Sequence, residues 1–579
     1  MLKLFRLLAP YRRQVVLVLV LALAQSIGTL VPPRLIADIV DRGIVRGDQL
    51  VILKIGALML VVSVIATACA IAGSYVSAKV ATGFGRTLRG VIFSRASHLS
   101  VHQFDQLGAA SLITRTTNDT TQVQRMLSMM LTMVIAAPMM AAGGIILALS
   151  QDTQLALVLI AVVPVMAVVF GVIMRGAVPL STAMQGKIDR LNLVLGEGLA
   201  GVRVIRAFDR GERQRERFDA ANRDATDTAI AVNRLIAVLM PVLILMLNLT
   251  SVAIIWVGSH RIDQGAMQVG TMIAALQYSM QILFAVFMVT AVFVMLPRAS
   301  ASAARINEVL DREPEIVEPA EAVLRSVPTD RRRGRVEFKD ATFQYPGAEE
   351  PALSGVSFVA EPGEVTAIIG GTGSGKSTLA GLIPRFYDVN GGRVLIDGVD
   401  VREVPQAELR ARIGFVPQKA VLFAGTVAAN IRFGRDDASD DEVRHAADVA
   451  QALDFVEAMP DAFAATISQG GINLSGGQKQ RLSIARAIVR RPDIYVFDDS
   501  FSALDFGTEA RLRAALRSET AAATVFVVAQ RISSVMRAHR IVVLENGRVA
   551  GLGTHAELLE HSAVYREIVA SQMSLDEVA

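Results

Sequence analysis

A glycine-rich stretch in the second half of the 579-residue chain has the residue types that hold phosphate groups. Its members are Gly370, Gly371, Thr372, Gly373, Ser374, Gly375, Lys376 and Ser377, followed by Thr378. They fit the pattern G-x-x-x-x-G-K-[ST], in which glycines let backbone N–H groups approach phosphate oxygens. The lysine reaches the β- and γ-phosphates, and the serine hydroxyl contacts Mg²⁺. The stretch therefore predicts a phosphate loop.

The sequence around this loop predicts the elements that would position it. Residues 365–369 predict a strand and residues 378–383 open a helix, which is the context that a phosphate loop requires. A second apolar run, residues 494–498, predicts a strand that ends in Asp498. This carboxylate fits the Walker B role of holding Mg²⁺. The alternatives are a chance match in a glycine-rich loop and an ordinary strand-terminal aspartate.

A third motif lies between these two and carries a resemblance to a known family. Residues 474–481 read Leu-Ser-Gly-Gly-Gln-Lys-Gln-Arg, which resembles the signature of ATP-binding cassette (ABC) transporters. In that family two nucleotide domains dimerise head to tail, and each ATP lies between one subunit's Walker motifs and the other's signature. The resemblance therefore implies that four residues contact ATP in trans: Ser475, Gly476, Gly477 and Gln478.

The same resemblance assigns further positions one at a time. Tyr345 resembles the aromatic residue that stacks on adenine, with a strand core residue as the alternative. Gln418 resembles the Q-loop glutamine that senses Mg²⁺, and Asp505 resembles the D-loop aspartate. The implied cofactors are ATP and Mg²⁺. The metal contacts would come from Ser377, Gln418 and Asp498.

Two positions depart from the family pattern. Asp499 stands where the family normally has the glutamate that aligns or activates the attacking water. Gln530 stands where the family normally has a switch-loop histidine, and a neutral amide cannot supply imidazolium charge. Together they resemble the degenerate-site subunit of heterodimeric ABC exporters. A catalytically normal homodimer is the alternative.

The first half of the chain is apolar enough to lie in a membrane. Hydrophobic residues make up 52% of the chain and charged residues 19%, which excludes disorder and disfavours a purely soluble protein. The single cysteine, Cys69, excludes a disulfide framework and a multi-cysteine metal site. Six apolar stretches are each long enough to cross about 30 Å of hydrocarbon as a helix: residues 15–39, 51–78, 127–149, 154–174, 235–257 and 271–296.

The distribution of basic residues predicts the orientation of these spans. Lys and Arg concentrate before the first span, in the loop between the second and third spans and in the loop between the fourth and fifth. The positive-inside rule places both termini and these two long loops in the cytoplasm, so we expect a multi-pass cell-membrane protein with a cytoplasmic nucleotide-binding domain. Because the basic residues are spread over loops, no nucleic-acid partner is expected.

Few polar side chains interrupt the spans. Arg34 and Asp38 are four residues apart and are predicted to pair within one helix, with a substrate-cavity role as the alternative. Lys54 is expected to reach the outer headgroups. Five further residues can line a cavity or hydrogen-bond between helices: Gln25, Asn248, Gln277, Tyr278 and Gln281.

The predicted fold is an α-helical membrane domain of six transmembrane helices, of the ABC exporter type, plus an α/β P-loop NTPase domain. Residues 1–310 form the membrane domain with two long, helical cytoplasmic loops, and residues 311–335 a linker. Residues 336–572 form the ATP-binding cassette, and residues 573–579 a C-terminal tail. Family position places the coupling helices, which contact the nucleotide domains, near residues 105–115 and 202–211.

These features predict one half of an ATP-driven exporter of apolar or amphipathic compounds such as drugs or lipids. The expected partners are a second ABC half-transporter subunit, membrane lipid and the transported compound. Three alternatives remain: an importer of a lipid or metal-chelate compound, a homodimeric exporter, and an ATP-gated channel or sensor.

Overall fold

The computed structural model describes residues 2–319 and 333–572, so the predicted tail at 573–579 and part of the predicted linker lie outside the described residues. The chain divides into two compact units. The first comprises Met1–His98 and Leu107–Glu313, and the second comprises Leu99–Gln106 and Pro314–Ala579.

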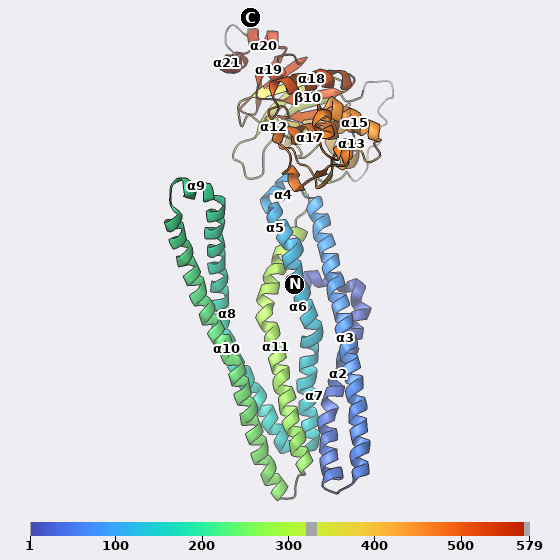
Figure 1. Ribbon diagram of the computed structural model, residues 1–579, viewed down its shortest axis with the longest axis vertical. Helices are drawn as coiled ribbons and strands as arrows, with labels where there is room; N and C mark the ends of the chain where they lie inside the picture. Colours follow the sequence, from blue (N-terminus) through green and yellow to red (C-terminus); the bar gives the residue numbers. More distant parts are fainter. Residues whose placement is uncertain (1, 320–332, 573–579) are drawn as a thin grey trace. The chain divides into compact units, whose positions relative to one another are not determined.

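The first unit consists of long helices (Figure 1). Six of its helical segments are long and apolar enough to cross a membrane, which confirms the six predicted spans. Its principal helices are α2 (Arg12–Asp38), α3 (Gln49–Ser97), α6 (Thr120–Met129), α7 (Ile135–Gln151), α8 (Thr153–Ala200), α10 (Gly211–Asp263) and α11 (Val269–Leu310). Because α3, α8 and α10 contain 49, 48 and 53 residues, they extend well beyond the hydrocarbon thickness.

Short helices lie close to both predicted coupling positions. Helix α9 (Val202–Ala207) joins α8 to α10 within the predicted range, and this hairpin diverges from the other helices of the unit toward α9 (Figure 1). Helix α4 spans Val101–Leu107 and overlaps the predicted range 105–115, and α5 (Ala109–Thr114) lies within it. Local capping fixes the start of α4, because Ser100 and Gln103 exchange side-chain-to-backbone hydrogen bonds of 3.2 Å.

Hydrogen bonds between α2 and α11 use two of the polar residues singled out in the spans. The Tyr278 hydroxyl donates to the Leu30 carbonyl at 3.2 Å, and Gln281 Nε2 donates to the Thr29 carbonyl at 3.0 Å. These two residues therefore form helix–helix contacts.

The predicted pairing of Arg34 with Asp38 is wrong. Asp38 Oδ1 lies 3.2 Å from Arg42 Nε, one turn further along the chain. A carboxylate four residues before a cation is the favoured orientation of such a helical pair, which explains why Asp38 pairs forward with Arg42 rather than backward with Arg34.

Polar contacts hold the C-terminal end of α11 within the first unit. Asp119 accepts hydrogen bonds of 2.8 Å from Ser302 Oγ and from Arg305 Nε. Arg115 pairs with Glu308, and Lys3 pairs with Asp311 at 2.8 Å. This cluster fixes the residues that lead into the linker.

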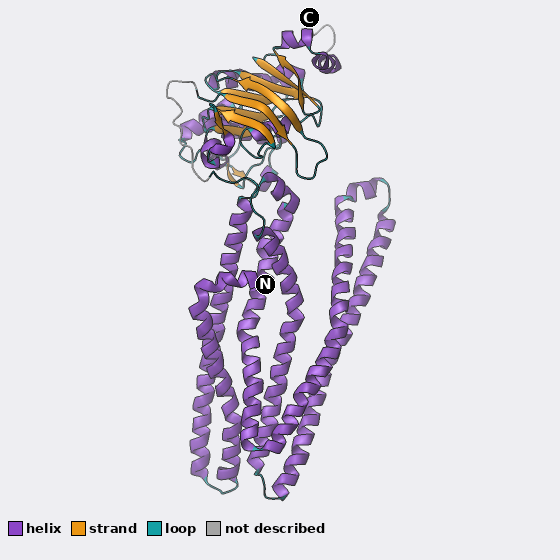
Figure 2. Cartoon of the chain, turned by 180° about the vertical axis from the view of Figure 1, so that it is seen from behind, coloured by secondary structure: helices purple, strands orange, loops and turns teal. Residues whose placement is uncertain are grey.

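The second unit contains an α/β fold with a largely parallel six-stranded sheet, as predicted (Figure 2). The strand order is β12 (Arg548–Gly553), β11 (Arg540–Glu545), β3 (Val365–Gly370), β10 (Thr524–Val528), β9 (Ile494–Asp498) and β6 (Ile413–Val416). Only the β11–β12 pair is antiparallel. Both faces are buried: on β9, Tyr495 and Phe497 face one apolar cluster and Ile494 and Val496 face the other, which explains its continuous apolar sequence.

Smaller sheets and helices surround this sheet. A four-stranded antiparallel sheet has the order β2 (Leu353–Ala360), β1 (Val336–Phe343), β4 (Gly391–Ile396) and β5 (Val399–Asp400), and β7 (Gly425–Thr426) pairs with β8 (Thr466–Ile467). The helices of the unit include α12 (Lys376–Leu382), α13 (Gln406–Ala411), α14 (Val427–Arg432), α15 (Asp440–Val449), α16 (Leu453–Glu457), α17 (Gly476–Val489), α18 (Phe506–Glu519), α19 (Ile532–Val535), α20 (His555–His561) and α21 (Ala563–Gln572).

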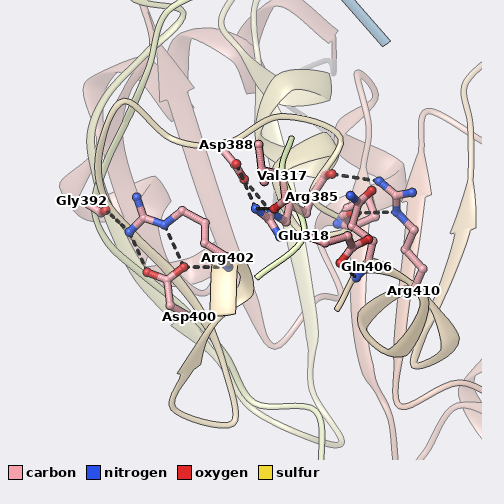
Figure 3. Close-up of polar contacts among 10 residues, drawn as sticks. Val317, Glu318, Arg385, Asp388, Gly392, Asp400, Arg402, Gln406 and Arg410 are labelled. Carbon is pink, nitrogen blue, oxygen red and sulfur yellow. Dashed lines mark hydrogen bonds and ion pairs between the residues drawn. The ribbon is translucent and has the colours of Figure 1, made fainter. Parts of the chain in front are cut away.

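The segment that enters this second unit is fixed to it by polar contacts. Glu315 accepts a 2.5 Å hydrogen bond from Ser100 Oγ, which precedes α4. The Val317 carbonyl accepts from Arg385 Nη2 at 3.2 Å, and Glu318 accepts from the Gln406 N–H at 3.1 Å (Figure 3). Arg385 is buried and also binds Asp388. The described linker residues therefore follow a defined path from α4 to the loop after α12.

Candidate ATP-binding site

The predicted nucleotide-site residues follow four neighbouring parallel strands. The phosphate loop follows β3, Gln530 follows β10, Asp498 ends β9, and Gln418 follows β6. Because the carboxyl ends of parallel strands meet at one edge of a sheet, these side chains converge there. The fold thus brings together residues that are up to 160 positions apart, between Gly370 and Gln530.

The phosphate loop has the backbone conformation that its glycines allow. Gly373 and Gly375 have φ angles of 82° and 96°, values that L-residues with a side chain rarely adopt. A Cβ at Gly375 would also lie 2.6 Å from the Ala352 carbonyl oxygen. The Lys376 ammonium donates to the carbonyls of Gly370 and Gly371 at 2.9 and 2.6 Å. Burial lowers the pKa of Lys376.

The donor set beside the loop fits Mg²⁺. Ser377 Oγ donates to Asp498 Oδ1 at 3.0 Å, which places a hydroxyl and a carboxylate together, and oxygen ligands are those that Mg²⁺ prefers. Burial raises the pKa of Asp498, while the Ser377 hydrogen bond opposes this shift. The Ser374 hydroxyl is buried without a hydrogen-bond partner, so the loop also has an unused polar atom to offer a phosphate.

Asp499 is held by two neutral amides. Its Oδ2 accepts hydrogen bonds from Gln418 Nε2 at 3.2 Å and from Gln530 Nε2 at 3.0 Å. Burial raises the pKa of Asp499, and the hydrogen bond from Gln418 is the largest opposing effect. Both positions that depart from the family pattern thus meet at one carboxylate oxygen.

The signature residues form the start of α17. Ser475 caps this helix: its Oγ accepts from the Gln478 N–H at 3.3 Å, and its own N–H donates to Gln478 Oε1 at 2.9 Å. A Cβ at Gly476 would meet nothing within 4 Å, whereas one at Gly477 would lie 3.2 Å from the Ala503 carbonyl oxygen. Among the described residues, no hydrogen bond joins these four residues to the phosphate loop. Ser475 and Gly476, at the start of α17, are exposed.

Comparison with known proteins places the chain in a family. Residues 15–286 match the model of the ABC transporter transmembrane region, and residues 353–502 match that of the ABC transporter. The chain is 44% identical over 566 residues to an uncharacterised ABC transporter ATP-binding protein of Mycobacterium tuberculosis, covering 97% of this chain and 96% of the relative. The chain belongs to the ABC transporter family. It is a membrane protein that couples ATP hydrolysis to transport.

Two other relatives indicate the branch of the family. The transporter is 35% identical over 551 residues to an ATP-dependent lipid A-core flippase of Thiobacillus denitrificans, covering 94% of this chain and 93% of the flippase. A solved bacterial Atm1-family ABC exporter with ATP bound matches with a TM-score of 0.82 and 28% identity, covering 97% of this chain and 98% of the exporter. The fold is therefore that of an ABC exporter half-transporter.

Tyr345 lies in the transporter just beyond the end of β1. Its hydroxyl is 3.0 Å from Thr378 Oγ1, and its ring packs edge-on against Phe343 and Tyr387. The hydrogen bond ties the tyrosine to the residue that follows the phosphate loop. Adenine stacking on this ring stays a prediction.

One residue that contacts the backbone beside Gln530 could not be predicted from the sequence. The side chain of Gln572, at the end of α21, accepts from the Ile532 N–H at 2.8 Å and donates to the Gln530 carbonyl at 2.7 Å. It therefore clamps the backbone on both sides of the switch-loop residue Arg531. No motif marks Gln572, because its role depends on how α21 packs 42 residues further along the chain.

Removing this clamp should loosen the switch loop. In Gln572→Ala the Ile532 amide loses its acceptor, so we expect its hydrogen exchange to accelerate by about tenfold. Exchange of a peptide covering residues 529–534, followed by mass spectrometry, measures this change. Ser571→Ala is the matched control, since within the described part of the chain the Ser571 hydroxyl bonds only the Ile568 carbonyl. Unchanged protection in Gln572→Ala would contradict the clamp.

Proposed function

We propose that this transporter is one half of an ATP-driven exporter of apolar or amphipathic compounds, with lipids as the favoured class. The exporter fold and the relative named as a lipid A-core flippase support this assignment. So do the six apolar spans, which suit cargo that partitions into the membrane. The positive-inside rule places both termini and the nucleotide-binding domain in the cytoplasm.

In this proposal the chain's own loop binds ATP. Backbone N–H groups of Gly370–Gly375, with Lys376, bind the phosphates, and Tyr345 stacks on adenine. Ser377, Asp498 and Gln418 provide oxygen ligands for Mg²⁺. The ion neutralises charge on the β- and γ-phosphates. Ser475, Gly476, Gly477 and Gln478 serve the site of the partner subunit.

The observation that carries the degenerate-site proposal is the pairing of Asp499 with two glutamines. A water-activating carboxylate must reach the water and accept its proton. Asp499 is one methylene shorter than glutamate, about 1.5 Å, and one of its oxygens already accepts from Gln418 and Gln530. Both amides are neutral, so no imidazolium faces the developing phosphate charge. This geometry favours ATP binding with slow or absent hydrolysis.

A degenerate site in this chain calls for a different partner chain. The signature of this chain would complete a competent site whose Walker residues come from the partner. ATP would close the two nucleotide domains, and the long cytoplasmic helices would transmit that movement to the spans. The cavity would alternate between inward-facing and outward-facing states, and hydrolysis at one site would reset it.

The first test is the ATPase activity of the chain purified alone in lipid, beside the same chain co-expressed with other half-transporters of its genome. We expect little activity alone and strong activity in one pairing. Robust activity alone would replace the heterodimer with a homodimer. Ion conductance without substrate-stimulated ATPase would instead indicate an ATP-gated channel or sensor.

The direction of transport needs a separate measurement. Inside-out vesicles expose the nucleotide-binding domains to added ATP, and an exporter should accumulate a fluorescent amphiphile in the lumen. ATP-dependent loss of lumenal amphiphile would instead indicate an importer on the same fold.

A further inference from the structure

Charge is scarce in the membrane spans of this transporter. The six predicted apolar stretches contain three charged residues: Arg34, Asp38 and Lys54. A charge inside the hydrocarbon is costly and marks a functional position unless it is paired or reaches the headgroups. Asp38 is paired with Arg42. The question is therefore whether Lys54 and Arg34 can reach the headgroups.

The packing of α2 on α3 gives the relative depth of the two cations. The helices run antiparallel: Gly28 of α2 lies against Ala66 of α3, and Gly43, in the π-helical turn Ile39–Ile44 that continues α2, lies against Ile52. Lys54 is thus near the turn that joins the helices at residues 45–48. The same register sets Arg34 level with Leu60, six positions past Lys54. At 1.5 Å per residue, Arg34 is about 9 Å deeper in the membrane.

Helix geometry directs Arg34 away from that turn. Side chains of an α-helix tilt toward its N-terminal end. For α2 this end is the basic start of the chain, on the opposite side of the span from Lys54. Arg34 would therefore have to extend against this tilt, across about 9 Å, to reach the nearer headgroups.

Arg34 lies on the side of α2 that faces α11. Asp41 Oδ1 accepts from the Gly270 N–H of α11 at 2.7 Å. Arg34 lies one α-helical turn after Leu30, whose carbonyl accepts from the Tyr278 hydroxyl of α11, and so shares the side of α2 that faces α11. Gln277 directly precedes Tyr278 on α11, so it lies within about a turn of the level of Arg34. Next to this level, the Tyr278 hydroxyl bonds the Leu30 carbonyl, one turn before Arg34.

The guanidinium of Arg34 forms no hydrogen bond and no ion pair with the described residues. Its side chain is exposed, and within residues 2–319 and 333–572 it has neither a hydrogen bond nor an acidic partner. One turn further along α11, Gln281 Oε1 is buried without a hydrogen-bond partner. Where α2 packs against α11, within the span, the structure therefore has the unpaired cation Arg34 and the side-chain amides of Gln277 and Gln281.

We propose that Arg34, with Gln277, binds the anionic headgroup of an amphipathic cargo, either a carboxylate or a phosphate. A guanidinium presents a planar fork of donors that matches both groups, and the low dielectric of the membrane strengthens the attraction. The binding site rests on the proposed transport function and adds a substrate class to it. The bound headgroup supplies the counter-charge that the described residues of this chain do not provide to Arg34.

The test compares three amphiphiles of equal chain length: a fatty acid, an alkyl phosphate and the uncharged fatty alcohol. Each is added to the full transporter, with its partner subunit, in proteoliposomes, and ATPase stimulation and ATP-dependent flux are measured. In Arg34→Gln we expect the half-maximal concentration of an anionic amphiphile to rise at least tenfold, with that of the alcohol unchanged. Arg34→Lys keeps the charge but loses the planar fork, so its half-maximal concentration for the anions should lie between those of the wild type and Arg34→Gln. Lys54→Gln is the matched control and should change neither.

The results distinguish failure of the headgroup site from failure of the proposed export function. Loss of only the carboxylate response, or only the phosphate response, identifies the headgroup. Equal losses for the alcohol and the anions in Arg34→Gln would overturn the headgroup site, as would no loss at all. Restored anion response after neutralising an acidic residue of the partner in the Arg34→Gln background would assign Arg34 to an ion pair at the subunit interface and also overturn it. If the wild type transports none of the three compounds, the proposed function fails with it.

Discussion

Gly476→Asp is expected to lower the ATPase activity of the assembled transporter by about 100-fold, the scale seen when a charge-stabilising donor is lost. Gly476 is the first residue of α17, and a Cβ there would meet no atom within 4 Å. An aspartate therefore fits without a clash, and a carboxylate at a helix N-terminus favours the helix. The fold should be retained while negative charge occupies the place where a partner-bound γ-phosphate would approach.

The isosteric Gly476→Asn separates charge from shape. It adds nearly the same volume without the negative charge, so it should retain more activity than Gly476→Asp. The ATPase rate of the purified complex in lipid measures both. If Gly476→Asp hydrolyses ATP normally, the signature of this chain does not serve a competent site.

Asp499→Asn provides the opposite comparison. It is isosteric, and loss of its charge should change the ATPase of the complex less than about threefold, because the site that it belongs to contributes little hydrolysis. A loss as large as that of Gly476→Asp would show that Asp499 is catalytic and would overturn the degenerate site.

Motifs predicted the strand ends of the nucleotide site but not the contacts between them. The glycine pattern and the run ending in Asp498 located β3 and β9, because each motif contains the residues of one strand and its following loop. The meeting of Gln418 and Gln530 on one oxygen of Asp499 depends on the order β10–β9–β6. Strand order is set by long-range packing, which a local pattern does not contain.

Two local features outside the nucleotide site have signals in the sequence. The sequence Ser100-Val-His-Gln103 fits a capping box, and Gly108, with φ of 73°, follows the last residue of α4. These signals predict both ends of α4. Arg42 also lies four residues from Asp38, in the favoured orientation, so the spacing alone already offered Asp38 a better partner than Arg34.

The clamp by Gln572 lies beyond sequence reasoning for a different reason. Its two hydrogen bonds go to backbone atoms of residues 530 and 532. Because the backbone N–H and carbonyl are common to nearly all residue types, the sequence at these two positions does not indicate the contact. Only the docking of α21 beside the switch loop reveals them.

Restoring the family's residues at positions 499 and 530 should make this chain's own ATP site hydrolyse ATP. In the Gly476→Asp background, where the partner's site is blocked, Asp499→Glu with Gln530→His should raise the ATPase activity by about tenfold or more. Burial already raises the pKa of Asp499, as a general base requires, so reach and the missing imidazole are what the site lacks. Glutamate adds about 1.5 Å of reach, and histidine replaces an amide that now holds Asp499. Adding Lys376→Ala should abolish the gain, because the activity must come from this chain's own phosphate loop. No gain over the Gly476→Asp background would mean that positions other than 499 and 530 keep this site inactive.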